Sequence, residues 1–477
     1  MAMRVIEKSE VAPPPGLVPS PTILPLTFLD IPWFCCRTIK RIFFYHFPHP
    51  THHFLQTILP ILKHSLSITL EHFFPYSSNL IIPSHSENVP PYIRYLNGDS
   101  LSFTIAESLA NFNLLISDSS QDVKNLHPFF PNLPSPHTEH NDTRVVPLMA
   151  IQVTILPNSG FAICLTFNHI AGDGKSLHQF MKLWSYVSKT KTINNRLSLE
   201  HSLPLDLLPS HERDRVRDPK NLKLTYLQEL KDVISKSTGH VQDSNNYVSK
   251  VRITLVLSHE QVLKLKKWVA DHSCKETSLQ KHMLSTFVVT CSLIWFCLIK
   301  SEKQRKGCCV FVDGDDLCYL VFHADCRDSP EISLPKNYFG NCLASKIVVV
   351  KRAELVGTNG IVAAANGIER KIRDFKSDNA LLGPKWWTSD HSELSKPGKS
   401  VVGIAGSPKF DVYETDFGWG KPKKSDAVHL DSSSSISISL SDCRDGGGGI
   451  QVGLALEEIQ MTNFSKIFQQ QVDQICL

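Results

Sequence analysis

Several features that would place a protein in a specialised class are missing from this 477-residue sequence. Its 50 basic and 46 acidic side chains leave a net charge of +4, without the strong positive excess of a nucleic-acid-binding protein. No apolar stretch typical of a secretory signal occurs near the N-terminus, so a cytoplasmic protein is expected. The most apolar run, 284–299, is short for a membrane span and contains Ser, Thr and Cys, which predicts a buried helix.

The thirteen cysteines also lack any C-x-x-C spacing, and no carboxylate or cysteine completes the histidines near residue 50 into a metal site. We therefore expect free thiols in a reducing compartment and no bound metal. A G-x-S-x-G motif is missing as well, so the sequence offers no serine nucleophile for a covalent acyl intermediate.

Length and hydrophobic patterning predict an α/β protein with two domains, in which mixed sheets are flanked by helices. Apolar positions alternate on both sides of a turn at 157–160, which predicts a two-stranded hairpin over 151–167. A polar stretch that includes Pro204 and Pro209 follows. We expect an N-terminal domain over 1–190, a crossover over 191–246 and a C-terminal domain over 247–477.

Helical spacing of apolar side chains predicts a helix over 54–70 and a second helix after Asp173. The second helix has one apolar face, and His178 and Lys182 lie on the opposite, polar face. In the second half of the chain, alternating patterns predict strands, and the glycine run 445–449 predicts a turn between the last two of them. These strands are expected at 251–258, 317–325, 343–350, 435–441 and 450–457.

Three separated motifs carry functional information: H-x-x-x-D-G at 169–174, N-Y-F-G-N-C at 337–342 and D-F-G-W-G at 416–420. A single motif of this kind can arise by chance, but three motifs in a fixed order and at fixed spacing form a specific pattern. Together they resemble the plant BAHD acyl-CoA-dependent acyltransferases over nearly the whole chain. The second and third motifs, with the glycine run, are similar to the subgroup of anthocyanin, flavonoid and phenolic glucoside malonyltransferases.

This resemblance implies two domains with the chloramphenicol acetyltransferase fold, with a segment over 361–400 that packs back onto the first domain. It also implies a monomer that transfers an acyl group, most simply malonyl, from coenzyme A to a sugar hydroxyl of a phenolic or flavonoid glucoside. Malonyl-CoA would then be a cosubstrate and not a permanently bound cofactor. From the weak net charge and the short apolar run we expect no nucleic-acid or membrane partner.

The chemistry of His169 supports the same reaction. An alcohol is a poor nucleophile at neutral pH, so acyl transfer from a thioester to a hydroxyl needs a base. Histidine titrates near neutrality and can take the alcohol proton and pass it to the leaving thiolate. His169 follows a strand pattern and lies in a turn with Gly172 and Gly174, which would place it rigidly in a cleft. The alternative is a hydrogen-bonded turn histidine.

Asp173 is expected to be structural and not part of a relay of the Ser-His-Asp type. It lies at the start of a helix, where a carboxylate favours free backbone N–H groups. The resemblance implies that this aspartate points away from the site and pairs with an arginine, for which Arg327 in "ADCRDSP" is the candidate. Ser329 stands where relatives often have a second arginine.

The other candidates are binding or structural residues. We expect the third motif, Asp416, Phe417, Gly418, Trp419 and Gly420, to be structural. The resemblance implies that Ser285 and Thr286 offer hydroxyls to coenzyme A, whereas the alternative is a bond back to the helix backbone. Lys175, His178 and Lys182 share one helix face, which is either solvated or a cationic site for an acidic acyl group or a coenzyme phosphate.

Two further readings stay open. The same fold can serve as a catalytically silent binding protein, although the intact His169 and Gly174 speak against it. The donor can also be a hydroxycinnamoyl-CoA, since members of the resembled subgroup use both donor classes.

Overall fold

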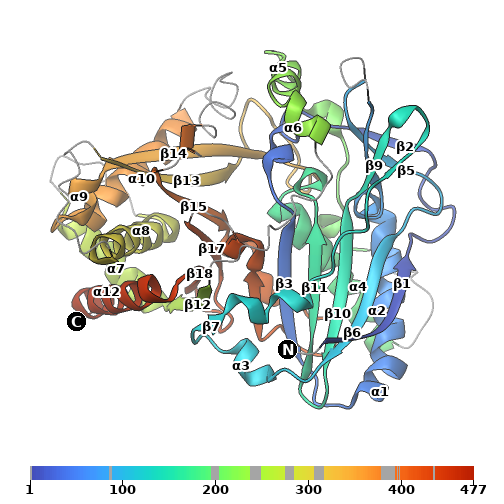
Figure 1. Cartoon of the computed structure of the whole chain (residues 1–477), viewed down its shortest axis with the longest axis horizontal. Helices are drawn as coiled ribbons and strands as arrows, with labels where there is room; N and C mark the ends of the chain where they lie inside the picture. Colours follow the sequence, from blue (N-terminus) through green and yellow to red (C-terminus); the bar gives the residue numbers. More distant parts are fainter. Residues whose placement is uncertain are drawn as a thin grey trace.

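The computed structural model describes residues 3–84, 89–194, 203–236, 249–273, 284–305, 316–377, 393–394, 396, 398–432 and 436–476. Two large sheets, each covered by helices, lie side by side (Figure 1). Buried apolar side chains form one extensive core for each sheet, as expected of a chain of this length.

The first sheet has six strands, and the predicted hairpin lies at its centre. Strands β10 and β11 are antiparallel, and all sixteen of their residues are buried, because one face packs on helices and the other on loops and a smaller core. The strand order is β1 (Met3–Val11), β6 (Leu101–Ser108), β10 (Met149–Leu156), β11 (Gly160–Phe167), β3 (Ile39–His46) and β16 (Lys424–Ala427).

Helices α2 (Leu59–His72) and α4 (Gly174–Asn194) pack against one another beside this sheet. The predicted helix over 54–70 is present, although its beginning is divided into α1 (Thr51–His53) and a π-helical turn (Phe54–Ile58). The apolar face predicted for the second helix is confirmed, because Leu177, Phe180, Met181, Trp184 and Val187 are all buried in the first core.

The second sheet has seven strands and contains every strand predicted for the second half of the chain. Their order is β14 (Leu343–Lys351), β13 (Leu317–Asp325), β15 (Ser400–Gly406), β17 (Ile436–Asp442), β18 (Ile450–Glu457), β12 (Lys250–Leu257) and β7 (Gln121–Asp122). Strands β17 and β18 are antiparallel, and the glycine run joins them as predicted. Three glycines of this run have φ between 71° and 82°, which favours glycine.

Helix α8 (Thr286–Arg305) is the buried helix predicted from the apolar run. It packs among α7 (His259–Asp271), α9 (Arg352–Val356), α10 (Gly360–Ser377) and α12 (Glu458–Cys476). No helix within the described ranges is both long and apolar enough to cross a membrane.

The expected position of 361–400 is wrong for its helical part. Helix α10 packs on α8 and β14, and its buried residues, among them Ile361 and Ile368, belong to the second core. Phe375, near the end of the helix, contacts the first core. Residues 378–392 of this segment lie outside the described residues.

Each large sheet also borrows a strand from the other half of the chain, which the simple division at 190 and 246 did not predict. Strand β16 pairs with β3 in the first sheet, and β7 pairs with β12 in the second. Phe417 of the D-F-G-W-G motif therefore lies in the first core and not in the C-terminal domain to which the motif was assigned.

A third, five-stranded sheet lies at the edge of the first half of the molecule. Its order is β2 (Thr22–Pro25), β5 (Tyr92–Tyr95), β4 (Asn79–Ile82), β9 (Arg144–Pro147) and β8 (His137–Thr138). Helix α4 extends to Asn194, so the first residues of the predicted crossover are helical. The crossover residues 203–236 contain α5 (Leu222–Glu229) and α6 (Lys231–Lys236), which pack on the first core. A short helix, α3 (Phe112–Ile116), follows β6.

Candidate active site

His169 lies where β11 ends and the chain turns into α4. The Asn168 Oδ1 atom accepts a hydrogen bond from the Ile170 N–H at 3.0 Å and so caps a short 3-10 helix, His169–Ala171. Helix α4 then begins at Gly174, where a Cβ atom would lie 3.1 Å from the ring of Phe410. The central strand of the first sheet thus fixes the backbone of His169.

Two side chains hold the imidazole of His169. Its Nδ1 atom lies 3.0 Å from Oδ1 of Asn341, the second asparagine of N-Y-F-G-N-C. The indole ring of Trp33 stacks on the imidazole with ring centroids 3.7 Å apart and planes only 4° from parallel. Trp33 is itself buried in a 3-10 helix, Ile31–Cys35, and the edge of His323 meets it at 5.2 Å.

Burial lowers the pKa of His169 below its usual 6.5, against smaller opposing contributions that include Asp173 and the hydrogen bond to Asn341. The imidazole is therefore neutral near pH 7 and can accept a proton. The geometry and the protonation state both suit a general base.

Asp173 and Arg327 form the predicted buried pair. The Asp173 Oδ2 atom lies 2.8 Å from Nη2 of Arg327, and both side chains are about 1% exposed. The same carboxylate accepts hydrogen bonds from the Ser176 N–H, where it caps α4, from the Ser176 hydroxyl and from the Cys342 N–H. Asp173 thus joins α4 to the N-Y-F-G-N-C segment and is not the partner of His169.

The D-F-G-W-G motif forms a turn that packs beside α4. The Asp416 Oδ1 atom accepts hydrogen bonds from the N–H groups of Gly418 and Gly420, and Oδ2 pairs with Lys189 at 2.7 Å. Phe417 meets Trp184 edge-on at 5.0 Å inside the first core. These contacts fit the structural role expected for the motif.

Ser285 precedes α8 and is exposed, and its Oγ atom accepts a hydrogen bond from the Val288 N–H at 3.2 Å. Ser285 therefore bonds to the backbone of the helix, which was the alternative to a contact with coenzyme A. Thr286 begins α8 and is partly buried. Residues 274–283, directly before them, lie outside the described residues.

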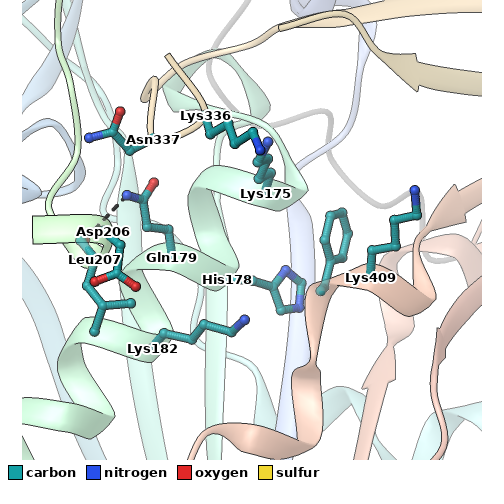
Figure 2. Close-up of a pocket in the computed structure, with 10 residues that line it drawn as sticks. Lys175, His178, Gln179, Lys182, Asp206, Leu207, Lys336, Asn337 and Lys409 are labelled. Atoms are coloured by element: carbon teal, nitrogen blue, oxygen red, sulfur yellow. Dashed lines mark hydrogen bonds between the residues drawn. The ribbon is translucent and has the colours of Figure 1, made fainter. Parts of the chain in front are cut away.

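The cationic face of α4 borders a pocket of about 380 Å³. Figure 2 shows Lys175, His178, Gln179 and Lys182 along α4 and Lys409 on a facing segment. Asp206, Leu207, Lys336, Asn337 and Phe410 complete the lining.

Two of the three predicted cations in this pocket are paired, and the third is neutral. Lys175 pairs with Asp325 and Lys182 with Asp411, each at 3.0 Å. The expectation that His178 is a solvated or cationic side chain is wrong. The Phe410 ring stacks on its imidazole, leaving it 4% exposed, and burial lowers its pKa to about 3.

Sequence reasoning missed Trp33 and Asp30 and gave Asn341 no role. Asn341 could have been singled out, because it is a polar residue between apolar ones in the N-Y-F-G-N-C motif. Nothing local marks Trp33 or Asp30, since each meets the site only through the folded chain.

Comparisons with known proteins identify the family and the fold of the chain. The model of the Transferase family matches residues 3–471, so the chain belongs to this family, and the resemblance to BAHD acyltransferases is confirmed. The coumaroyl-CoA:anthocyanidin 3-O-glucoside-6''-O-coumaroyltransferase 1 of Arabidopsis thaliana is 38% identical, over 98% of this chain and 97% of that protein. The malonyl-coenzyme A:anthocyanin 3-O-glucoside-6''-O-malonyltransferase of Dahlia pinnata is 34% identical, over 98% and 96%.

Among solved structures, vinorine synthase superposes with a TM-score of 0.66 at 17% identity, covering 97% of this chain and 96% of that one. This likeness confirms the fold.

Proposed function

We propose that this chain transfers an acyl group from acyl-CoA to a sugar hydroxyl of a glycosylated phenolic compound, with His169 as the general base. The observation that carries the proposal is a partly buried, neutral imidazole held through Nδ1 by Asn341, which leaves Nε2 for the substrate. The relatives named above, one a coumaroyltransferase and one a malonyltransferase of anthocyan(id)in glucosides, support this choice of acceptor.

In this mechanism Nε2 of His169 takes the proton of the sugar hydroxyl as its oxygen attacks the thioester carbonyl. The tetrahedral intermediate then expels the coenzyme A thiolate, which receives the same proton from the imidazolium. A C–O bond forms, a C–S bond breaks, and no acyl-enzyme is needed. General base catalysis of this kind contributes roughly 10²–10⁴-fold.

The test is His169→Ala, assayed with acyl-CoA and a flavonoid glucoside and read by mass. Turnover should fall by at least about 100-fold while the melting temperature stays close to that of the parent. His272→Ala is the matched control, because His272 is an exposed histidine that stacks on Trp268 in the second half of the molecule. Activity of His169→Ala within a few-fold of the parent would refute the assignment.

The donor is either malonyl-CoA, as the sequence resemblance suggested, or a hydroxycinnamoyl-CoA. A malonyl carboxylate that leaves water needs a cation and hydrogen bonds. Aspartates already pair with Lys175 and Lys182, and His178 is neutral. These three α4 side chains are therefore paired or neutral, and an aromatic donor needs no cation, so the aromatic donor is our expectation. A malonyl donor would need Lys336 or Lys409, which line the same pocket.

Competition between malonyl-CoA and p-coumaroyl-CoA at equal concentration distinguishes the two donors. We expect the coumaroyl ester to dominate. Lys336 and Lys409 line the same pocket and have no acidic partner in the described part of the chain. If malonyl dominates instead, Lys336→Ala and Lys409→Ala will show whether these two cations hold it. A protein that binds acyl-CoA and never turns it over would instead be a silent binding protein of this fold.

A further inference from the structure

We propose that Asn341 is a positioning residue, oriented by Asp30, that keeps the proton of neutral His169 on Nδ1 and the lone pair on Nε2. This inference rests on the proposed function and deepens it, because it names the groups that make His169 a base in one fixed tautomer. It assigns a role to Asp30, which lies 311 residues from Asn341 in the sequence.

The hydrogen bonds of Asn341 fix which end of its amide faces His169. Its Nδ2 group lies 3.0 Å from Oδ1 of Asp30 and 2.9 Å from the backbone oxygen of His169, with the Ile170 oxygen at 3.4 Å. All three neighbours are acceptors, so the NH₂ group must point toward them. The remaining atom, Oδ1, then faces the imidazole and can only accept.

A neutral imidazole carries its proton on one ring nitrogen, and the partner of the other nitrogen decides which. Because Asn341 Oδ1 cannot donate, Nδ1 of His169 must hold the proton to make the observed 3.0 Å bond. Nε2 is then the basic nitrogen. The flat stack of Trp33 restricts the ring plane, so the lone pair keeps one direction.

Asp30 is held as firmly as the amide that it orients. Its Oδ2 atom accepts hydrogen bonds from the N–H and hydroxyl of Thr27, at 2.8 and 2.7 Å, and pairs with Arg213 at 2.6 Å. Its Oδ1 atom accepts from both the backbone N–H and the Nδ2 group of Asn341. The carboxylate is fully buried, so its orientation does not vary with solvent.

The neutral amide differs chemically from the aspartate that orients histidine in a Ser-His-Asp triad. An adjacent carboxylate would raise the pKa of the histidine, whereas an amide fixes the tautomer with a much smaller effect on charge. The Asp30 carboxylate makes no hydrogen bond to His169, and its coulombic effect on the imidazole is smaller than the effect of burial. His169 thus stays an unprotonated base although it is well oriented.

The direct experiment compares Asn341→Ala with Asp30→Asn, using Tyr338→Phe as the control from the same motif. Asp30→Asn is the sharper variant because it is isosteric. Three donors converge on the Oδ2 position, so the new amide must place its oxygen there and its NH₂ toward Asn341. The new NH₂ group then opposes both the backbone N–H and the Nδ2 group of Asn341, so the Asn341 amide loses its charged acceptor and keeps only the backbone oxygens of His169 and Ile170. In molecules whose amide turns over, an NH₂ group faces Nδ1 and imposes the wrong tautomer.

Two readouts separate this role from a merely structural one. The first is the ¹⁵N spectrum of the protein labelled at histidine, with the His169 signals assigned by difference from His169→Gln. The parent should show a protonated Nδ1 and an unprotonated Nε2, and Asp30→Asn should show the reverse or a mixture. The second is kinetics, where kcat should fall and KM should change little.

We expect kcat to fall between about 10-fold, usual for a lost orienting partner, and about 10⁴-fold, the cost of the wrong tautomer in a protease triad. Tyr338→Phe should leave kcat and the spectrum unchanged, since its hydroxyl has no hydrogen-bond partner among the described residues. Asp30→Asn leaves the buried Arg213 without its charged partner, so circular dichroism checks the folding of both variants, and either variant that folds carries the test.

The proposal is overturned if folded Asp30→Asn or Asn341→Ala keeps the parent's kcat, or if their His169 signals still report the parent's tautomer. The spectrum does not depend on turnover. A parent protein that shows the expected tautomer without transferring any acyl group would therefore refute the proposed function and leave the positioning by Asn341 intact.

Discussion

Replacing Asp173 by alanine should strongly destabilise the protein because it leaves a buried charge without its main partner. Arg327 is about 1% exposed, and its Nη2 atom lies 2.8 Å from the carboxylate. Breaking a buried ion pair from one side costs roughly 3–5 kcal/mol. Arg327 keeps the backbone oxygens of Tyr338 and Gly340 and the carboxylate of Asp325, so we expect the lower end, about 3 kcal/mol.

Thermal unfolding monitored by circular dichroism measures this loss. At about 2–4 °C per kcal/mol for a large domain, the melting temperature should fall by roughly 6–12 °C. Asp173→Asn keeps the shape of the side chain and some of its hydrogen bonds, so its melting temperature should fall less than that of Asp173→Ala. Lys421→Ala is the surface control, because Lys421 and Glu414 form an exposed pair whose removal should change stability by less than about 1 kcal/mol.

The activity of the folded variant completes the argument. If Asp173 is structural, the folded fraction of Asp173→Asn should retain most of the parent's kcat. An Asp173→Ala protein that melts with the parent and yet is inactive would refute this reasoning, and would make a direct chemical role for the carboxylate the better explanation.

Three more outcomes are expected. Burial lowers the pKa of His169 below 6.5 and the neutral form is the base, so kcat/KM should decline as pH falls, with a midpoint below 6.5; a midpoint above 6.5 contradicts this. Trp33→Leu should lower kcat by about 2–30-fold, because an indole face stabilises an imidazolium by roughly 0.5–2 kcal/mol. Trp33→Phe should recover part of this loss, and equal kcat in Trp33→Leu and the parent would exclude this role. Asp416→Ala should lower stability by about 1 kcal/mol, because the partly buried Gly418 N–H loses its acceptor while the exposed Gly420 N–H can bond to water. The kcat per folded molecule, with the folded fraction measured by circular dichroism, should not change; a selective loss of kcat would indicate a part in catalysis.

Patterns that follow from burial were readable in the sequence. The alternation over 151–167 predicted β10 and β11, and the apolar face after Asp173 predicted the side of α4 that packs, because both reflect one element meeting one core. His169 was singled out by the three motifs taken together, whereas the Asp173–Arg327 pair was predicted only from the resemblance to the BAHD family.

Contacts between distant segments were not readable. His178 lies on the polar face of α4 by helical spacing, yet Phe410 covers it in the folded chain. Asp30 meets Asn341 across 311 residues, and Trp33 reaches His169 from an unremarkable 3-10 turn. The strands that each sheet takes from the other half are short and carry no local signal of their destination.

The place of β16 at the edge of the first sheet affects how the protein must be made. Its partner β3 is synthesised about 380 residues earlier, since Phe44 pairs with Lys424. At roughly 5–20 residues per second, the ribosome needs about 20–80 s to supply the closing strand. Throughout that time the apolar edge of β3 is open to pairing with other nascent chains. Expression of residues 1–246 alone would make this exposure permanent, so the first half should be harder to obtain as a monomer than the whole chain.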